Sequence, residues 1–233
     1  MNKKFTELAK KSKVIVIKVG SNILVNEKHV LRKKWLTSLI EDVQKLHKKG
    51  SKIIIVSSGA IALGRNILSK KKLTNLHEKQ AAASIGQIQL SQQWQKAFAK
   101  FNIQSSQILI TAEDLNERRK YLNIRNTIYS LMDLNVVPII NENDTTSTEE
   151  IRFGDNDKLS AMIANALSAE LLILLSDVNG LYTANPKKST DAKLITSVEE
   201  VNQEIEKYID KDLSEFGSGG MLAKVNAAKL CIQ

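Results

Sequence analysis

The stretch Val14-Ile-Val-Ile-Lys-Val-Gly-Ser21 decides the fold class of this sequence. Residues 14–17 form a β-branched run with no polar residue in alternation. Such a run indicates a strand covered on both faces, which is typical of parallel sheets in α/β proteins. The residues from Lys18 to Ser21 then predict the end of the strand and a tight polar turn.

The same pattern recurs along the chain, each time as an apolar run followed by small or polar residues. Four further strands are therefore expected, at 53–56, 108–110, 136–140 and 171–175. Pro138 cannot donate a hydrogen bond to a neighbouring strand, so we expect a bulge or a strand end there. Between the runs, apolar residues recur three and four positions apart, as in the stretch from Trp35 to Leu46, which indicates helices.

Alternating strands and helices predict an α/β fold, a three-layer α/β/α sandwich with a largely parallel central sheet and right-handed crossovers. In such sheets the loops after the carboxyl ends of the strands converge on the ligand site. We therefore expect the polar clusters that follow the runs to lie at one edge of the sheet.

Length and composition agree with one large domain. The chain has 233 residues, of which 42% are hydrophobic, enough for a sizeable core. This composition excludes a disordered tail, a disulfide miniprotein and a collagen-like fibre. We expect a flexible lead-in at 1–13 and a single domain at 14–233. The one cysteine, Cys231, lies in an apolar stretch and is expected to be a buried, inert thiol in a reducing, intracellular compartment.

The charge balance is strongly basic, with 34 Lys and Arg against 25 Asp and Glu, a formal net charge of +9. A basic protein invites a nucleic-acid interpretation. However, the lysines are scattered and aromatic residues for base stacking are only 5% of the chain. No apolar run approaches the ~18 residues of a membrane span. We expect neither a nucleic-acid nor a membrane partner, and a cytoplasmic location.

Three glycine-rich turns are candidates for binding an anion. Lys18 precedes Gly20 and Ser21, where an ammonium and backbone N–H groups can share a phosphate. Ser58 and Gly59 open a helix, whose positive end attracts an anion. Residues 217–221 contain three glycines before a helix that carries Lys224. Taken singly, these features also fit an ordinary strand-end lysine and a plain serine cap.

Two clusters of amides and carboxylates complement these turns. The first, 141–144, follows the fourth predicted strand, and the second, 155–157, precedes a helix. Amide donors beside a carboxylate suit a zwitterion that carries both an ammonium and a carboxylate. The alternative for the second cluster is helix capping, because Asp and Asn are favoured N-caps.

Several familiar sites are excluded by their spacing. Gly59 and Gly64 imitate a P-loop, but Arg65 and Asn66 replace its lysine and hydroxyl residue. No G-x-G-x-x-G follows a strand, no EF-hand spacing occurs, and the three histidines lie outside the clusters. No protein metal ligand is predicted. Several anion-binding turns without a general base suit phosphoryl transfer to a nucleophile that is already ionised.

The clusters and their flanks form six motifs in a fixed order: Val16–Ser21, Val56–Ala62, Pro138–Asp144, Phe153–Ser160, Ser176–Tyr182, and Gly217–Met221 with Lys224. In that order they resemble the motifs of the glutamate 5-kinases, a branch of the amino acid kinase superfamily. The pair Asn141–Asp144 and Gly154–Asp157 distinguishes this branch from carbamate, aspartate and uridylate kinases.

The resemblance implies ATP-dependent phosphorylation of the side-chain carboxylate of L-glutamate, the first step of proline biosynthesis. It implies that Lys18 and Lys224 neutralise charge on the transferring phosphoryl group while Asp157 holds both lysines in place. The implied glutamate-binding residues are Ser58, Gly59, Asn141, Asp144, Asp155 and Asn156. The implied ATP-binding residues are Lys18, Gly20, Ser176, Asp177, Ser218, Gly219, Gly220, Met221, Leu222, Ala223 and Lys224.

The resemblance also implies cofactors and partners. ATP would be the co-substrate, with Mg²⁺ bridging its phosphates and few direct protein ligands. Proline would be a feedback inhibitor and the protein a homo-oligomer, a dimer or a tetramer. Many members carry a C-terminal PUA domain, and this chain, which stops at Gln233, is expected to lack it and the last edge of the kinase sheet.

Two alternatives to a glutamate 5-kinase remain. The first is another member of the amino acid kinase family. The second is a non-catalytic sensor of an amino acid or a nucleotide. The presence of Lys18, Asp157 and Lys224 together favours an enzyme, because a sensor would be free to lose them.

Overall fold

A computed structural model describes residues 3–69, 72–147, 155–203, 205–206, 208 and 220–232. Strands and helices alternate along the chain, as the sequence predicts. The strands are β1 (Val14–Val19), β2 (Lys52–Ser57), β3 (Ser105–Ile110), β4 (Val137–Glu142), β5 (Leu171–Leu175), β6 (Leu181–Tyr182) and β7 (Leu194–Ile195). The helices are α1 (Lys3–Lys11), α2 (Ser21–Leu24), α3 (Lys33–His47), α4 (Ala60–Ile67), α5 (Leu76–Ala99), α6 (Ala112–Asn116), α7 (Arg118–Asp133), α8 (Asp155–Ala166) and α10 (Gly220–Ile232).

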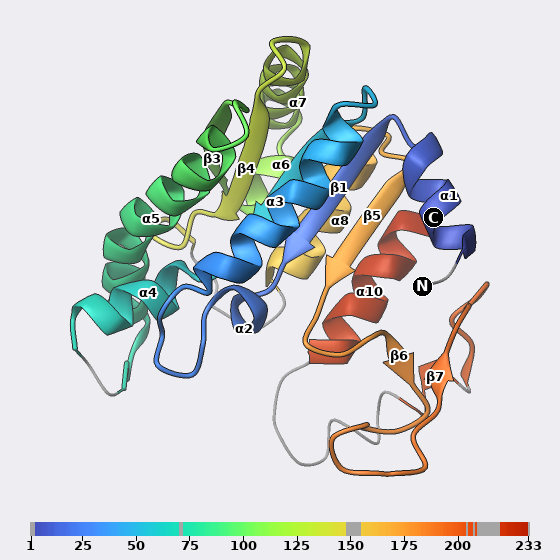
Figure 1. Ribbon diagram of the computed structural model, residues 1–233. Helices are drawn as coiled ribbons and strands as arrows, with labels where there is room; N and C mark the ends of the chain where they lie inside the picture. The colour runs from blue at the N-terminus through green and yellow to red at the C-terminus, as the bar shows by residue number, and fades with distance from the viewer. Residues whose placement is uncertain are drawn as a thin grey trace.

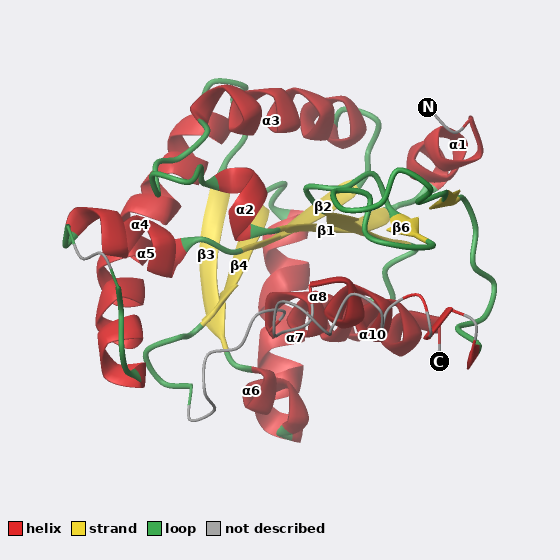
Figure 2. Ribbon diagram, turned by 90° about the horizontal axis from the view of Figure 1, so that it is seen from below, coloured by secondary structure: helices red, strands yellow, loops and turns green. Residues whose placement is uncertain are grey.

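The main sheet has five parallel strands in the order β3-β4-β2-β1-β5 (Figure 1). Figure 2 shows the sheet edge-on, with α3 above it and α7, α8 and α10 below it. Short β6 and β7 pair antiparallel, apart from the main sheet. The predicted three-layer α/β/α sandwich with a parallel central sheet is confirmed.

The apolar strand runs serve two cores because successive side chains of a strand point to opposite faces. Ile15 and Ile17 pack with α3 and α5 in one cluster of buried residues. Val16 packs with α7 and α8 in the other cluster. A strand that contributes to a core on each face has no place for regular polar alternation, which explains the continuous apolar run.

The connections between the parallel strands determine where a crevice forms at the edge of the sheet. The connections after β1 and β2 run over the face that carries α3 and α5, whereas the connection after β4 runs over the face that carries α8. β2 and β4 are neighbours in the sheet. Their following loops therefore leave toward opposite faces, which opens a crevice at the carboxyl ends of these two strands.

Two local expectations have a different or sharper outcome. Residues of the expected lead-in form α1, which buries Ala9 and leaves Phe5 half exposed. Its apolar residues recur at helical spacing, but among its described side chains only Ala9 is buried, and Leu8 is about as exposed as Phe5. Pro138 is the second residue of β4, and the pairing of β4 with β2 begins one residue later, at Ile139. It therefore lies at a strand end, as expected.

Helices α4 and α5 cross in close contact at two glycines. A Cβ atom added at Gly86 would lie 1.8 Å from the carbonyl oxygen of Ala60 and 2.5 Å from the backbone nitrogen of Gly64. One added at Gly64 would lie 1.8 Å from the carbonyl oxygen of Ala82. Gly64 is thus required for helix packing and Gly59 caps α4, in agreement with the exclusion of a P-loop.

Replacing Gly86 by Ala is expected to destabilise the fold. The new methyl group has no space, so the helices must separate, at a cost of about 3 kcal/mol in the free energy of unfolding. Urea denaturation followed by circular dichroism measures this loss. Ser84→Ala, on the exposed side of the same helix, is the control and should unfold like the wild type. Equal midpoints for Gly86→Ala and wild type would contradict the close crossing.

Candidate functional site

Asp157 forms ion pairs with two lysines that come from distant parts of the chain. Its Oδ1 lies 2.7 Å from Nζ of Lys18 on β1, and its Oδ2 lies 3.1 Å from Nζ of Lys224 on α10. The Asp157 side chain is 2% exposed, that of Lys18 7% and that of Lys224 17%. The structure therefore brings together all three predicted catalytic residues, Lys18, Asp157 and Lys224.

The charges of this triad do not cancel. Two ammonium groups share one carboxylate, which leaves a formal excess of 2 − 1 = +1 when all three groups are ionised. The pKa of Lys18 is lowered, first because burial disfavours its charged form and then because Lys224 repels it, although the Asp157 carboxylate opposes this shift. A second anion beside the lysines would relieve the repulsion, so the triad is suited to binding a phosphate.

Asn156, the residue next to Asp157, organises a set of neutral polar side chains. Its amide nitrogen donates to Oγ of Ser58 and to Oδ1 of Asn141, both at 3.0 Å. Its amide oxygen accepts the backbone N–H of Glu142 at 3.2 Å. Three of the predicted glutamate-binding residues, Ser58, Asn141 and Asn156, are therefore in direct contact. The first turn of α8 thus carries both the charged triad and the neutral network.

The backbone at the ends of β1 and β2 is also shaped for close approach. Gly59 has φ of +114°, a left-handed conformation that favours glycine, and it caps α4. A Cβ atom at Gly20 would lie 3.8 Å from Nζ of Lys18, so Gly20 lies beside the triad. Both predicted glycines are therefore found at the carboxyl edge of the sheet, next to Ser58 and Lys18.

The predicted nucleotide residues lie on two elements. Ser176 and Asp177 directly follow β5, and Ser176 Oγ donates to Asp177 Oδ1 at 3.3 Å. Residues 220–224, from Gly220 through Met221, Leu222 and Ala223 to Lys224, form the first turns of α10. Of the remaining ATP calls, Ser218 and Gly219 lie outside the described residues.

Asp144 lies two residues beyond β4. It lines a pocket of about 420 Å³ between that loop and α5, together with Asn143, Gln87 and Gln92. Asp155 begins α8, but its side chain lies outside the described part of the structure. Two of the six predicted glutamate residues are thus placed at the same edge of the sheet without a described contact to Asn156.

The structure adds two residues that the sequence analysis missed. Lys187 donates to Oδ2 of Asp177 at 2.5 Å and, through this bond, lowers the pKa of the Asp177 carboxyl. Gln87 on α5 accepts from the Asn141 amide at 2.8 Å. A signal for Gln87 is present, because it interrupts the buried side of α5 between Ala83 and Leu90. Lys187 lies in a lysine-rich loop and carries no such signal.

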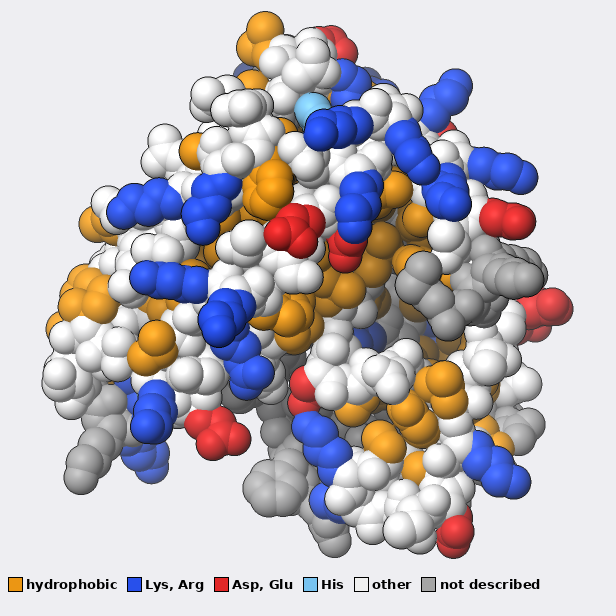
Figure 3. Space-filling view, viewed as in Figure 1, with side chains coloured by type: hydrophobic (Ala, Val, Ile, Leu, Met, Phe, Trp, Pro, Cys, Tyr) orange, Lys and Arg blue, Asp and Glu red, His pale blue; other side chains and the backbone are white. Residues whose placement is uncertain are grey.

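Other expectations concern residues outside the site. Cys231 is half-buried, and burial raises the pKa of its thiol, which agrees with an inert cysteine. Lys and Arg side chains are spread over the face shown in Figure 3 rather than gathered in a stripe. Among the described residues, no helix is long and apolar enough to cross a membrane. Within the same residues, no three His, Cys, Asp or Glu side chains gather as metal ligands.

The parallel sheet with a lysine–aspartate–lysine triad at its carboxyl edge defines an α/β protein with a candidate anion site. The sequence profile of the amino acid kinase family matches residues 13–233, and the chain belongs to this family. It is 50% identical over 223 residues to the glutamate 5-kinase of Pelagibacter ubique. The alignment covers 95% of this chain and 61% of that protein. It is 46% identical over 222 residues to the glutamate 5-kinase of Paramagnetospirillum magneticum, covering 95% of this chain and 60% of that protein.

The chain thus spans about three fifths of the length of these relatives. Among solved structures, an isopentenyl phosphate kinase has a TM-score of 0.60 at 18% identity, covering 85% of this chain and 84% of that one. The T. acidophilum isopentenyl phosphate kinase product complex has the same TM-score and coverage at 14% identity. At this identity the likeness supports the fold alone.

Replacing Asp157 by Asn is expected to destabilise the protein, because two buried ammonium groups lose their counter-charge. Breaking a buried pair in this way costs about 3–5 kcal/mol. The pKa of Lys18 should fall further below 10.5, so the folded variant binds fewer protons than the unfolded chain. Its stability should therefore rise as the pH increases from 7 toward 10.

Denaturant titrations at several pH values measure both effects. Asp42→Asn is the matched control, because Asp42 pairs with Lys45 on the exposed surface. It should leave stability and its pH dependence unchanged. A variant Asp157→Asn that is as stable as the wild type at pH 7 would contradict the ion-paired triad.

Proposed function

We propose that the protein catalyses ATP-dependent phosphorylation of the side-chain carboxylate of L-glutamate to glutamyl 5-phosphate, the first step of proline biosynthesis. The main support for the proposal is the first turn of α8. There Asp157 forms ion pairs with two lysines, and Asn156 donates hydrogen bonds to Ser58 and Asn141. A phosphate site thus adjoins a neutral site of hydrogen-bonding groups. The glutamate 5-kinases to which the chain is similar support the choice of substrate.

The reaction requires positioning and charge compensation but no general base. A glutamate side-chain carboxylate oxygen attacks the γ-phosphorus of ATP, the bond from that phosphorus to the bridging oxygen breaks, and ADP leaves. The nucleophile is already ionised at neutral pH, so no proton has to be removed. Lys18 and Lys224 would stabilise the negative charge on the transferring group and on the leaving oxygen.

The substrate would be held by the neutral network. Ser58, Asn141 and Asn156 would bind the carboxylates of glutamate, with Asp144 and Asp155 for its ammonium and Gly59 as a backbone donor. Gly20, the pair Ser176 and Asp177, and residues 218–224 would line ATP. The domain responsible would extend over 14–233.

Mg²⁺ would enter with ATP rather than on a protein site. The Asp157 carboxylate already contacts two ammonium groups, and the described side chains form no cluster of metal ligands. Phosphate oxygens and water suit the octahedral preference of this ion. We further propose a cytoplasmic homo-oligomer inhibited by proline, from the likeness to glutamate 5-kinases.

Replacing Lys224 by Ala is expected to lower kcat by about 100-fold, because one donor to the transferring phosphoryl group is lost. The assay is ATP-dependent formation of acyl hydroxamate from glutamate and hydroxylamine. Lys229→Ala, on the same helix but paired with Glu206 at the surface, is the control and should retain full activity. Aspartate, carbamate and UMP are offered separately as alternative acceptors, and release of ADP is measured for each, because the UDP formed from UMP gives no hydroxamate.

The outcomes separate the alternatives. Product from glutamate alone supports the proposal, whereas product from another of these substrates supports a different kinase of the family. ATP binding without any product would support a non-catalytic sensor and would overturn the proposed activity.

A further inference from the structure

We infer that Gln87 of α5 is a positioning residue that holds the Asn141 amide in one orientation, so that Asn156 stays in place and Ser58 presents a donor to a carboxylate of the substrate. This inference rests on the proposed function. It identifies the Ser58 hydroxyl as the donor that selects a hydrogen-bond acceptor in the substrate. It follows from one backbone contact and three side-chain contacts.

The direction of the chain is determined at a backbone N–H group. The N–H of Glu142 can only donate, and it lies 3.2 Å from Oδ1 of Asn156. The oxygen of the Asn156 amide must therefore face β4, and its nitrogen must face the other way. That nitrogen has two hydrogens, which it donates to Oδ1 of Asn141 and to Oγ of Ser58.

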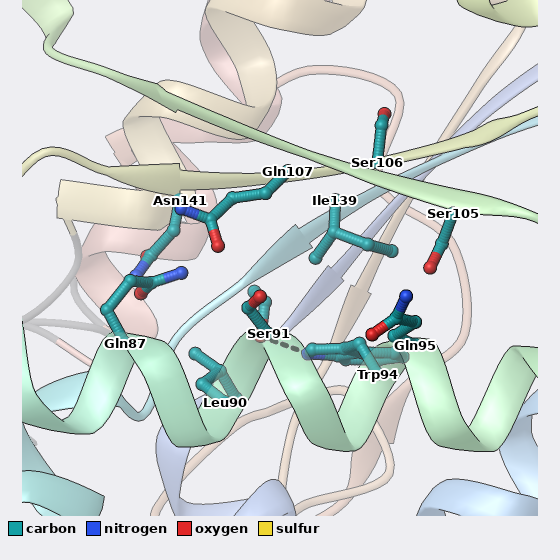
Figure 4. Close-up of a pocket in the computed structure, with 11 residues that line it drawn as sticks. Gln87, Leu90, Ser91, Trp94, Gln95, Ser105, Ser106, Gln107, Ile139 and Asn141 are labelled. Carbon is teal, nitrogen blue, oxygen red and sulfur yellow. Dashed lines mark hydrogen bonds between the residues drawn. The ribbon is translucent and has the colours of Figure 1, made fainter.

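The same reasoning fixes Asn141. Because Oδ1 of Asn141 accepts from Asn156, its nitrogen is the atom that faces α5, and there it meets Oε1 of Gln87 at 2.8 Å. Figure 4 shows Gln87 and Asn141 facing each other across the gap between α5 and β4. Asn141 is 3% exposed, so an unpaired amide there would be costly. Gln87 is thus the terminal acceptor of the chain.

The consequence reaches Ser58 at the other end. Its oxygen accepts from Asn156, which leaves the hydroxyl hydrogen of Ser58 to donate. A donor at this point favours an acceptor in the ligand, and a carboxylate is the strong acceptor of an amino acid. Without the Gln87 acceptor the Asn141 amide can turn its nitrogen toward Asn156. Asn156 then loses one of its partners and holds the Ser58 hydroxyl less firmly.

A second contact from α5 shows why this helix can hold the site. The indole N–H of Trp94 donates to Oγ of Ser57, the residue directly before Ser58, at 2.9 Å. Trp94 is 1% exposed. At Gly86, the neighbour of Gln87, α5 crosses α4 in close contact, and this contact fixes the position of α5 relative to α4. Gln87 therefore projects from a rigid element.

The test compares Gln87→Met with Gln87→Glu. Met preserves volume but cannot accept, whereas Glu keeps an acceptor for the Asn141 amide. We expect Gln87→Met to raise the KM for glutamate about tenfold, the size of one hydrogen bond, with kcat and the KM for ATP within about twofold of wild type. We expect Gln87→Glu to stay within about threefold of the wild-type KM.

A role in packing alone gives the opposite order, because the charged side chain would then be the harmful one. Gln95→Met is the matched control, since it changes the same residue type on the same helix and in the same pocket. Gln95→Met should behave like the wild type. Gln87→Ala provides the same comparison if Gln87→Met does not fold.

A double-mutant cycle with Ser58→Ala tests whether Gln87 acts through Ser58. If it does, adding Gln87→Met to Ser58→Ala raises the KM little further. Three outcomes would overturn the inference: full additivity in the cycle, a larger effect of Gln87→Glu than of Gln87→Met, or an unchanged KM in both Gln87→Met and Gln87→Ala. In each of these cases, turnover of glutamate by the wild type would still uphold the proposed function. Wild-type protein without any turnover of glutamate would overturn the proposed function and the inference together.

Discussion

The buried carboxylate of Asp157 between two ammonium groups is the interaction on which the site depends. A buried charge is tolerated only when it is paired, so β1, α8 and α10 must meet wherever this carboxylate lies. These elements come from the beginning, the later middle and the end of the described chain. Correct assembly of the sheet with α8 and α10 and formation of the proposed phosphate site are therefore the same event.

The neighbouring position, Asn156, connects this charged triad to a network without formal charge. The first turn of α8 belongs to both, so its placement sets the separation between the proposed phosphate site and the proposed glutamate site. Proximity and orientation account for a large share of the barrier in group transfer. A helix turn that is held by two lysines on one side and by amides on the other is rigid. It can therefore fix both the proximity and the orientation of the reacting groups.

The topology explains why the neutral network of Ser58, Asn141 and Asn156 lies at the carboxyl ends of β2 and β4. These strands are adjacent and parallel, and the helices that follow them cover opposite faces of the sheet. Ser58 follows one strand and Asn141 lies near the end of the other. The glycines at which α4 and α5 cross place α5 beside this crevice, where Gln87 and Trp94 reach the ends of both strands.

Much of the fold and part of the site could be predicted from local sequence. The strand runs, the parallel sheet and the residues after its strands follow from patterns between near neighbours, such as the apolar residues 14–17 before Lys18. Such patterns show which side chains lie at the carboxyl edge, because period and turn chemistry are local properties. The motif resemblance extended this to Asp157 and Lys224.

Only the tertiary structure decided which of these side chains touch. The bond between Lys224 and Asp157 joins residues 67 positions apart, and that between Asn156 and Ser58 joins residues 98 apart. Gln87 and Lys187 lie in no motif, and Gly64 imitates a phosphate loop while it serves a helix crossing. Contacts of this kind depend on how helices pack against the sheet. A local sequence pattern does not show which distant residue a side chain will contact.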